Sequence, residues 1–151
     1  MKILCLIPAR KNSNRVKNKN FIKLNGKSLV DRALSIAKKI KKFNKIVLST
    51  DNKQFLKFNK NYSNIIFLNR PKDISKNETK MSEVIKHTLK YFKDKNELFD
   101  AIVILQPTSP FRRISTINKA ISKFKKFYPD YLASVSFLKK NQSPKMILKK
   151  K

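Results

Sequence analysis

The stretch Ile3-Leu4-Cys5-Leu6-Ile7-Pro8-Ala9-Arg10 decides the fold of this chain. Five consecutive apolar residues that end at a proline leave no polar face, which is typical of a strand buried on both sides of a sheet. Shorter apolar segments recur along the sequence, each followed by polar residues. We expect strands at 2–8, 45–50, 65–68, 101–105 and 131–137.

Between these segments, apolar residues recur at the spacing of a helix with one buried face. We expect helices at 29–42, 81–92 and 114–128, and a weaker one at 51–61. Strands that alternate with helices of this length predict right-handed crossovers and a mostly parallel sheet with helices on its faces. The expected fold is α/β, a Rossmann-like three-layer sandwich formed by a single domain, 1–151.

The composition is strongly basic, with 37 Lys and Arg against 9 Asp and Glu and a net charge of +28. Clustered cations favour nucleic acid, but lysine is spread along this whole chain. Exposed charges farther apart than the ~8 Å Debye length hardly reinforce one another. Nucleic-acid binding is therefore a less favoured alternative. The 40% hydrophobic content predicts a folded core, which makes intrinsic disorder a poor interpretation.

Membrane insertion and disulfide bonding are not expected. No apolar run approaches the ~20 residues of a membrane span. Residues 3–7 are too few for the ~7–15-residue core of a signal peptide. Cys5 is the only cysteine, so an intramolecular disulfide and a thiolate metal cluster are both excluded. A cytoplasmic protein with no membrane partner is the expectation.

Polar segments follow four of the expected strands. In a parallel sheet the carboxyl ends of the strands form one edge, where ligands bind, so these loops should converge. The first loop, Ala9–Asn20, carries five cations and a hydroxyl directly after a buried strand. Guanidinium groups grip phosphate oxygens and turn amides form anion nests, so this loop suits a polyphosphate. The other three loops are Ser49–Asp51, Asn69–Pro71 and Gln106–Arg112.

The motifs in these loops have a recognisable order. Pro8-Ala9-Arg10, Ser13 and Lys19-Asn20 are followed by four further blocks: Ser49-Thr50-Asp51, Arg70-Pro71, Val84-Ile85-Lys86-His87 and Leu105-Gln106-Pro107-Thr108-Ser109-Pro110. Together they resemble the acylneuraminate cytidylyltransferase family, which includes CMP-N-acetylneuraminic acid synthetase. The fold that the resemblance implies is that of nucleotide-diphospho-sugar transferases.

The resemblance implies transfer of CMP from CTP to the anomeric hydroxyl of a nonulosonic acid, a nine-carbon 2-keto sugar acid of the sialic type, with release of pyrophosphate. It implies catalytic roles for Lys19 and Arg10. It implies nucleotide contacts from Arg10, Ser13, Arg15, Lys19, Asn20, Arg70 and Ser82. It places Gln106 and Ser109 toward the sugar.

Each assignment has a structural alternative. Arg70 also fits a solvated strand end, and Ser82 and Asp51 also fit helix caps. For His87, packing or a hydrogen bond is a better interpretation than catalysis. Family members usually have glycines where this chain has Lys11 and Asn12, so Lys11 would be strained if its φ were positive.

The C-terminal part of the pattern is missing. The resemblance implies Mg²⁺ held by paired aspartates, but no Asp or Glu follows Asp130, and no metal ligand is assigned. It also implies that the chain is C-terminally truncated, without the last third and its dimerisation segment, and that the full-length protein is a homodimer. Three hypotheses remain: a cytidylyltransferase, an inactive CTP-binding fragment, and a basic nucleic-acid-binding protein.

Overall fold

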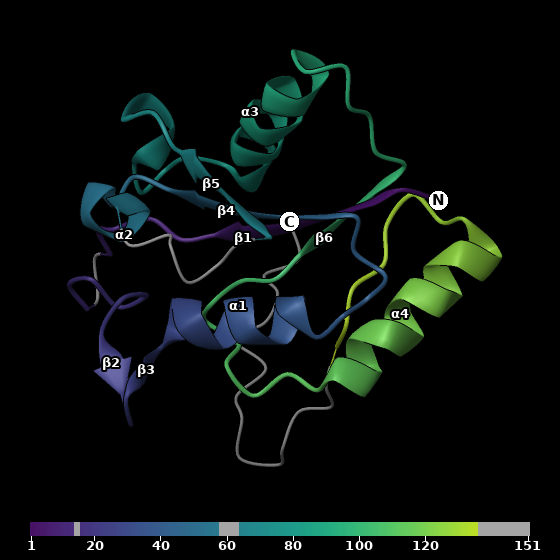
Figure 1. Ribbon diagram of the computed structural model, residues 1–151, viewed down its shortest axis with the longest axis horizontal. Helices are drawn as coiled ribbons and strands as arrows, with labels where there is room; N and C mark the ends of the chain where they lie inside the picture. The colour runs from purple at the N-terminus through teal and green to yellow at the C-terminus, as the bar shows by residue number, and fades with distance from the viewer. Residues whose placement is uncertain (14–15, 58–63, 136–151) are drawn as a thin grey trace, which may run out of the picture.

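A four-stranded parallel sheet forms the centre of the protein. The computed structural model describes residues 1–13, 16–57 and 64–135. The sheet order is β5-β4-β1-β6, and all three pairings are parallel (Figure 1). The first four predicted strands are confirmed to within one residue at either end: β1 (Ile3–Pro8), β4 (Lys45–Thr50), β5 (Ile65–Asn69) and β6 (Ala101–Ile104).

The first strand is buried on both faces, as its apolar run predicts. Ile3 to Ile7 are each at most 1% exposed. Because side chains alternate along a strand, Cys5 packs into one core and Leu6 into the other. The register places Leu6 beside Val47 of β4 and Ile104 of β6. β1 therefore holds together both neighbouring strands and both cores.

Helices cover both faces of the sheet, and this confirms the three-layer arrangement. α1 (Leu29–Lys38) and α4 (Ile114–Phe127) pack on one face, and α3 (Met81–Lys93) packs on the other (Figure 1). The short α2 (Lys53–Lys57) contributes Phe55 to the core shared by α1 and α4. Among the described residues, no helix has both the length and the apolar character that crossing a membrane requires.

A tight hairpin leads into α1. β2 (Lys23–Leu24) and β3 (Lys27–Ser28) pair across Asn25 and Gly26, whose φ values are +51° and +74°. Two consecutive positive φ angles are the geometry of a type I′ turn, which explains the Asn-Gly pair. Ser28 then caps α1: its hydroxyl accepts from the Asp31 amide at 3.1 Å, and its own amide donates to the Asp31 carboxylate at 3.0 Å.

Two helix predictions extend several residues beyond the observed elements, whereas the other two agree with α3 and α4 to within one residue. The helix expected to reach residue 42 ends at Lys38. The amides of Lys39 and Ile40 donate to the carbonyls three residues earlier, which tightens the last turn. This turn buries Ile40 to 3% exposure. The weaker helix expected at 51–61 is present as α2, and 58–61 lie outside the described residues.

The strand predicted at 131–137 is wrong for the residues that the structure describes. Tyr131–Val135 form no strand and are exposed, and 136–137 lie outside the described residues. Within the described chain, β6 pairs with β1 alone. An apolar, alternating sequence becomes a strand only where another strand satisfies its backbone groups, and 131–135 pair with none of the described strands.

Candidate functional site

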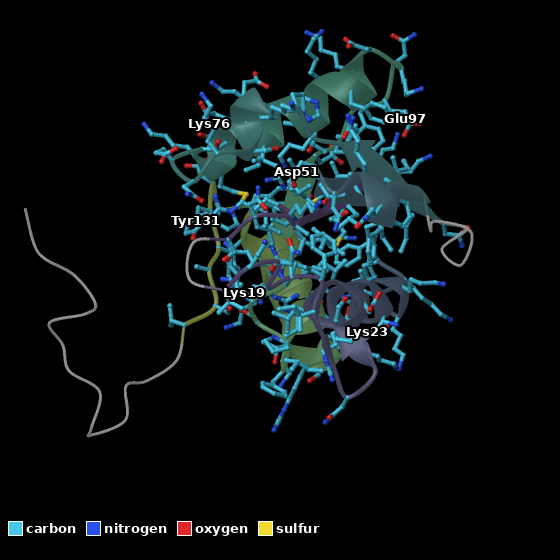
Figure 2. The ribbon with its side chains drawn as sticks, turned by 90° about the vertical axis from the view of Figure 1, so that its left-hand side faces the viewer. Lys19, Lys23, Asp51, Lys76, Glu97 and Tyr131 are labelled. Atoms are coloured by element: carbon cyan, nitrogen blue, oxygen red, sulfur yellow. The ribbon has the colours of Figure 1, made fainter. Side chains whose placement is uncertain are left out.

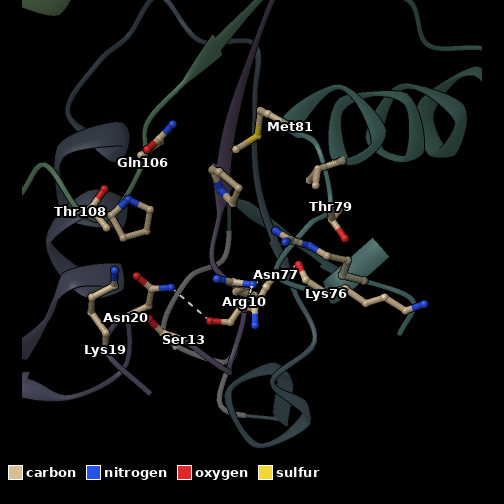
Figure 3. Close-up of a pocket in the computed structure, with 14 residues that line it drawn as sticks. Arg10, Ser13, Lys19, Asn20, Lys76, Asn77, Thr79, Met81, Gln106 and Thr108 are labelled. Atoms are coloured by element: carbon tan, nitrogen blue, oxygen red, sulfur yellow. Dashed lines mark hydrogen bonds between the residues drawn. The ribbon is translucent and has the colours of Figure 1, made fainter. Parts of the chain in front are cut away.

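The loops at the carboxyl edge of the sheet surround one cavity of about 250 Å³ (Figure 3). Its lining comes from the loops after β1, β5 and β6 and from the start of α3. The predicted convergence is thereby confirmed for three of the four loops. Ser49–Asp51 lie behind the lining instead of in it. The lining residues are Pro8, Arg10, Ser13, Lys19, Asn20, Arg70, Lys76, Asn77, Thr79, Met81, Val84, Gln106, Pro107 and Thr108.

Arg10 connects two walls of this cavity. Its Nη1 donates to the Lys76 carbonyl at 3.0 Å and to the Asn77 side-chain oxygen. Its own carbonyl accepts from Asn20 Nδ2 at 3.1 Å, the dashed line in Figure 3. The first loop is thus joined through one arginine to the segment that leads into α3.

A turn in the first loop presents Lys19 and Asn20. Asn18 has φ +54°, and its carbonyl accepts from the Phe21 amide at 2.8 Å. The left-handed position that a glycine would favour therefore falls on Asn18, and among the described residues neither Lys11 nor Asn12 has positive φ. Asparagine tolerates this geometry better than most residues, so the loop turns with no glycine.

Arg70 is buried at the end of β5, only 6% exposed, so the solvated-strand interpretation is wrong. Its Nε donates to Ser49 Oγ at 3.1 Å and its Nη2 to the Ser49 carbonyl at 2.8 Å. The Arg70 amide donates to the Thr50 carbonyl at 2.8 Å and continues the pairing of β5 with β4. The end of β4 therefore fixes both the backbone and the guanidinium of Arg70 beside the cavity.

The cavity is electropositive. Arg10, Lys19, Arg70 and Lys76 line it, and the described residues of the lining include no carboxylate. Burial lowers the pKa of Arg70 to about 10, with the Asp51 carboxylate opposing the shift and the Arg10 guanidinium adding to it. Arg70 still carries its charge at neutral pH. Four cations around a small cavity repel one another unless an anion lies between them, so the site is suited to a polyanionic ligand.

The loop after β6 forms the opposite wall. Gln106 and Thr108 line the cavity, and Ser109 is exposed outside it. The Gln106 carbonyl accepts from the Ser109 amide at 3.2 Å and from Arg112 Nη2. Both bonds lie within one short loop, so they hold its turn and the position of Gln106.

The structure brings six of the predicted residues together around the cavity: Arg10, Ser13, Lys19, Asn20, Arg70 and Gln106. Ser82 and Ser109 are exposed and do not line it. The helix-cap alternative for Ser82 is wrong, because α3 has Lys80 as its N-cap. Arg15 lies outside the described residues. The roles of these residues in binding and catalysis stay predictions.

The sequence reasoning missed one wall of the cavity. Lys76, Asn77 and Thr79 line it from the segment between the short 3-10 helix η2 (Asp73–Ser75) and α3. These residues show no periodic pattern. Their only signal is their place between the Arg70-Pro71 rim motif and an amphipathic helix, where a polar linker must pass the carboxyl edge of the sheet.

The described residues do not fit a protein-held Mg²⁺ ion. They contain no group of three or more His, Cys, Asp or Glu side chains that could hold a metal, and the cavity lining offers amides, hydroxyls and cations. A hard divalent cation needs carboxylate or similarly dense oxygen ligands. No reaction step is therefore assigned to a metal here.

His87 lies on α3, partly buried, with a buried Nδ1 atom that has no hydrogen-bond partner. Burial lowers its pKa, Arg70 lowers it further, and Asp73 opposes both effects. His87 does not line the cavity. The packing interpretation is therefore better supported than catalysis.

His87 predicts a pH dependence of stability. Because its pKa is lower in the folded than in the unfolded protein, its contribution is present above its ordinary pKa of about 6.5 and is lost as pH falls through the lower folded value. We expect the melting temperature of the wild type to fall more between about pH 7.5 and about pH 5.5 than that of His87→Gln. Since His87 is the only histidine, NMR titration of one imidazole resonance measures its pKa directly. A folded pKa at or above 6.5 would contradict the expectation.

Comparison with known families agrees with this geometry. The family model described as cytidylyltransferase matches residues 4–146. The chain is 31% identical over 146 residues to the N-acylneuraminate cytidylyltransferase of Escherichia coli O18:K1:H7, covering 97% of this chain and 33% of that protein. It is 34% identical over 121 residues to the CMP-N,N'-diacetyllegionaminic acid synthase of Legionella pneumophila, covering 80% and 52%. The chain thus spans about a third to a half of these relatives.

Solved structures share the fold. A CMP:2-keto-3-deoxy-manno-octonic acid synthetase complexed with CTP superposes with a TM-score of 0.66 at 16% identity, over 85% of this chain and 49% of that one. A 4-diphosphocytidyl-2C-methyl-D-erythritol synthase gives 0.65 at 11% identity, over 82% and 54%. At such identities the likeness concerns the arrangement of the sheet and helices.

Proposed function

Because the chain belongs to the cytidylyltransferase family, we propose that it forms the nucleotide-binding part of an enzyme that transfers CMP from CTP to a nonulosonic acid. The observation that carries this proposal is the cavity in which Arg10, Lys19 and Arg70 meet, with no carboxylate among the lining residues that the structure describes. A triphosphate supplies the dense negative charge that such a cavity lacks. The proposed products are the CMP-sugar and pyrophosphate.

The proposed reaction needs positioning and charge more than covalent chemistry. The anomeric hydroxyl oxygen attacks the α-phosphorus and loses its proton to solvent, and the bond to the bridging oxygen of pyrophosphate breaks. Negative charge shifts toward the leaving pyrophosphate as that bond lengthens, and cations held beside it lower the barrier. Arg70 and Arg10 are held by hydrogen bonds to the protein, so little reorganisation accompanies the reaction. We assign Lys19 to the charge that develops around the α-phosphate.

The proposed acceptor is a nine-carbon 2-keto sugar acid, bound on the Gln106 side of the cavity. Relatives of this chain are named for acylneuraminic, diacetyllegionaminic and pseudaminic acids. These names support nonulosonic acids as the class of acceptor, and the particular acid is to be identified by experiment. Gln106 offers both a donor and acceptors for hydroxyl or acylamino groups. Homodimer formation, a cytoplasmic location and a role for Mg²⁺ stay predictions.

Pyrophosphate release tests this proposal. With CTP, Mg²⁺ and a panel of nonulosonic acids, we expect release that depends on the acid and is greater with CTP than with UTP. The assay uses this chain and a version extended with the C-terminal part of a family member. Release from the extended version alone would assign the activity to the longer protein. If neither version releases pyrophosphate, the proposed transfer is refuted.

A second candidate is CTP binding without turnover. It is favoured by the lack of a carboxylate in the described cavity lining, because the resemblance implies a metal that these residues do not hold. Calorimetry that shows CTP binding in the absence of pyrophosphate release would select it. The nucleic-acid alternative has less support, because the cations singled out by position surround a cavity suited to a small anion.

A further inference from the structure

We propose that Asp51 is a positioning residue that shapes the first loop for phosphate binding through one hydrogen bond to its backbone. The proposal rests on the proposed function, since it concerns the same cavity. Asp51 follows β4 and does not line the cavity. Figure 2 shows it at the centre of the molecule, with Lys76 above it and Lys19 below.

The bond in question joins residues far apart in sequence. The Lys11 amide donates to Asp51 Oδ1 at 2.6 Å, partly buried from solvent. Two residues earlier, the Ala9 amide donates to the Ser49 carbonyl at 2.9 Å and continues the pairing of β1 with β4. The Asp51 carboxylate takes the place of the next backbone carbonyl in that series. It therefore extends the ladder by one bond after β4 itself has ended.

This extension fixes the backbone on both sides of Arg10. The Ala9 amide is held by Ser49, the Arg10 carbonyl by Asn20, and the Lys11 amide by Asp51. With three consecutive residues held, the Arg10 side chain leaves the loop toward the cavity. Hydrogen bonds to a charged acceptor are stronger than neutral ones, so Asp51 supplies the strongest of these three anchors.

The alternative of a helix cap for Asp51 is wrong. The Phe55 amide of α2 donates to Asn52 Oδ1 at 3.3 Å, and the Asn52 amide donates to Thr50 Oγ1 at 3.1 Å. Asn52 therefore performs the capping, and the Asp51 carboxylate faces the first loop.

Removing the charge of Asp51 and removing its hydrogen bond to Lys11 should change anion binding in opposite directions. A negative charge near Arg70 opposes the approach of phosphate, so its neutralisation alone would strengthen anion binding. Loss of the hydrogen bond would loosen the loop and weaken binding. Asp51→Asn removes the charge and keeps an acceptor at Oδ1, whereas Asp51→Ala removes both. The matched control is Asp100→Asn, because Asp100 accepts from the Lys2 amide at the opposite end of the sheet.

The experiment combines amide hydrogen exchange at Lys11 with calorimetric binding of inorganic tripolyphosphate and CTP. We expect Asp51→Ala to lose protection at Lys11 and to bind both ligands about tenfold or more weakly, while Asp51→Asn keeps protection and binds within about threefold of the wild type or more tightly. Asp100→Asn should leave Lys11 protection and binding unchanged. Circular dichroism confirms that each variant is folded.

Three results would overturn the proposal: an unprotected Lys11 amide in the wild type, unchanged binding in Asp51→Ala, or equal weakening in Asp51→Asn and Asp51→Ala. Failure of the proposed function looks different. If tripolyphosphate binds as tightly as CTP and neither this chain nor its extended version releases pyrophosphate, the proposed CMP transfer fails while the role of Asp51 in anion binding stands.

Discussion

Replacing Lys19 with alanine is expected to lower kcat for CMP transfer by about 10²–10³-fold, the range found when one preorganised charge-stabilising donor is removed. Lys19 lines the cavity from a turn fixed by Asn18, so its backbone is already placed where its ammonium can meet developing charge. Because this charge grows in the transition state, kcat should fall more than the affinity for CTP. Steady-state kinetics with calorimetry measure both quantities, in the form of the protein that releases pyrophosphate.

Lys17→Ala is the matched control for Lys19. Lys17 is an exposed lysine two residues earlier in the same loop, outside the cavity lining. Its charge is screened by solvent and salt, so kcat should change by no more than about twofold. An equal loss in both variants would show that the loop acts through its total charge, and it would remove the specific role of Lys19.

Replacing Arg70 with alanine is expected to affect both binding and stability. The variant loses a buried cation beside the cavity, so CTP affinity should fall about 10–100-fold, as for a charge-assisted contact. It also leaves the Ser49 carbonyl and hydroxyl without the two bonds that Arg70 donates. We expect the free energy of unfolding to fall by about 1–3 kcal/mol. Calorimetry and urea denaturation measure the two effects separately.

Two controls separate these effects. Arg113→Ala removes the same charge from an exposed residue outside the cavity lining, so CTP affinity should change little. Arg70→Lys keeps a cation but loses the planar guanidinium, whose Nε and Nη2 both donate to Ser49. Compared with Arg70→Ala, it should therefore recover part of the CTP affinity and little of the stability. A destabilised Arg70→Ala protein with unchanged CTP affinity would mean that Arg70 serves the fold alone.

Much of the fold was predictable because its decisive signals are local. The apolar run at β1 has no polar face, and the Asn25-Gly26 pair needs positive φ angles that few other residues adopt. The rim motifs were identifiable because each directly follows a buried strand, and parallel strands bring their carboxyl ends to one edge. This reasoning placed the loops at one edge, the family resemblance singled out Arg10, Lys19 and Arg70 within them, and the structure brings all three to one cavity.

The remaining features depend on contacts between segments distant in sequence. The bond from Lys11 to Asp51 requires knowledge that β4 lies beside β1, and sequence reasoning placed Asp51 only in a loop at the carboxyl edge, with a helix cap as its structural alternative. The Asn77 contact to Arg10 likewise joins two loops that no periodic pattern connects. At Tyr131–Val135 the sequence alternates as a strand would. A segment becomes a strand only beside another strand, and local sequence preference does not show whether one is there.

The central position of β1 has a consequence for the order in which the protein can fold. Ile3 pairs with Ala101, so one edge of β1 stays open until about a hundred later residues have emerged. Contacts of such long sequence separation carry a large loop-closure cost and slow folding. An apolar strand with an unpaired edge is also a template for association with other chains. During translation, protection of β1 therefore depends on how soon the 101–104 segment follows it from the ribosome.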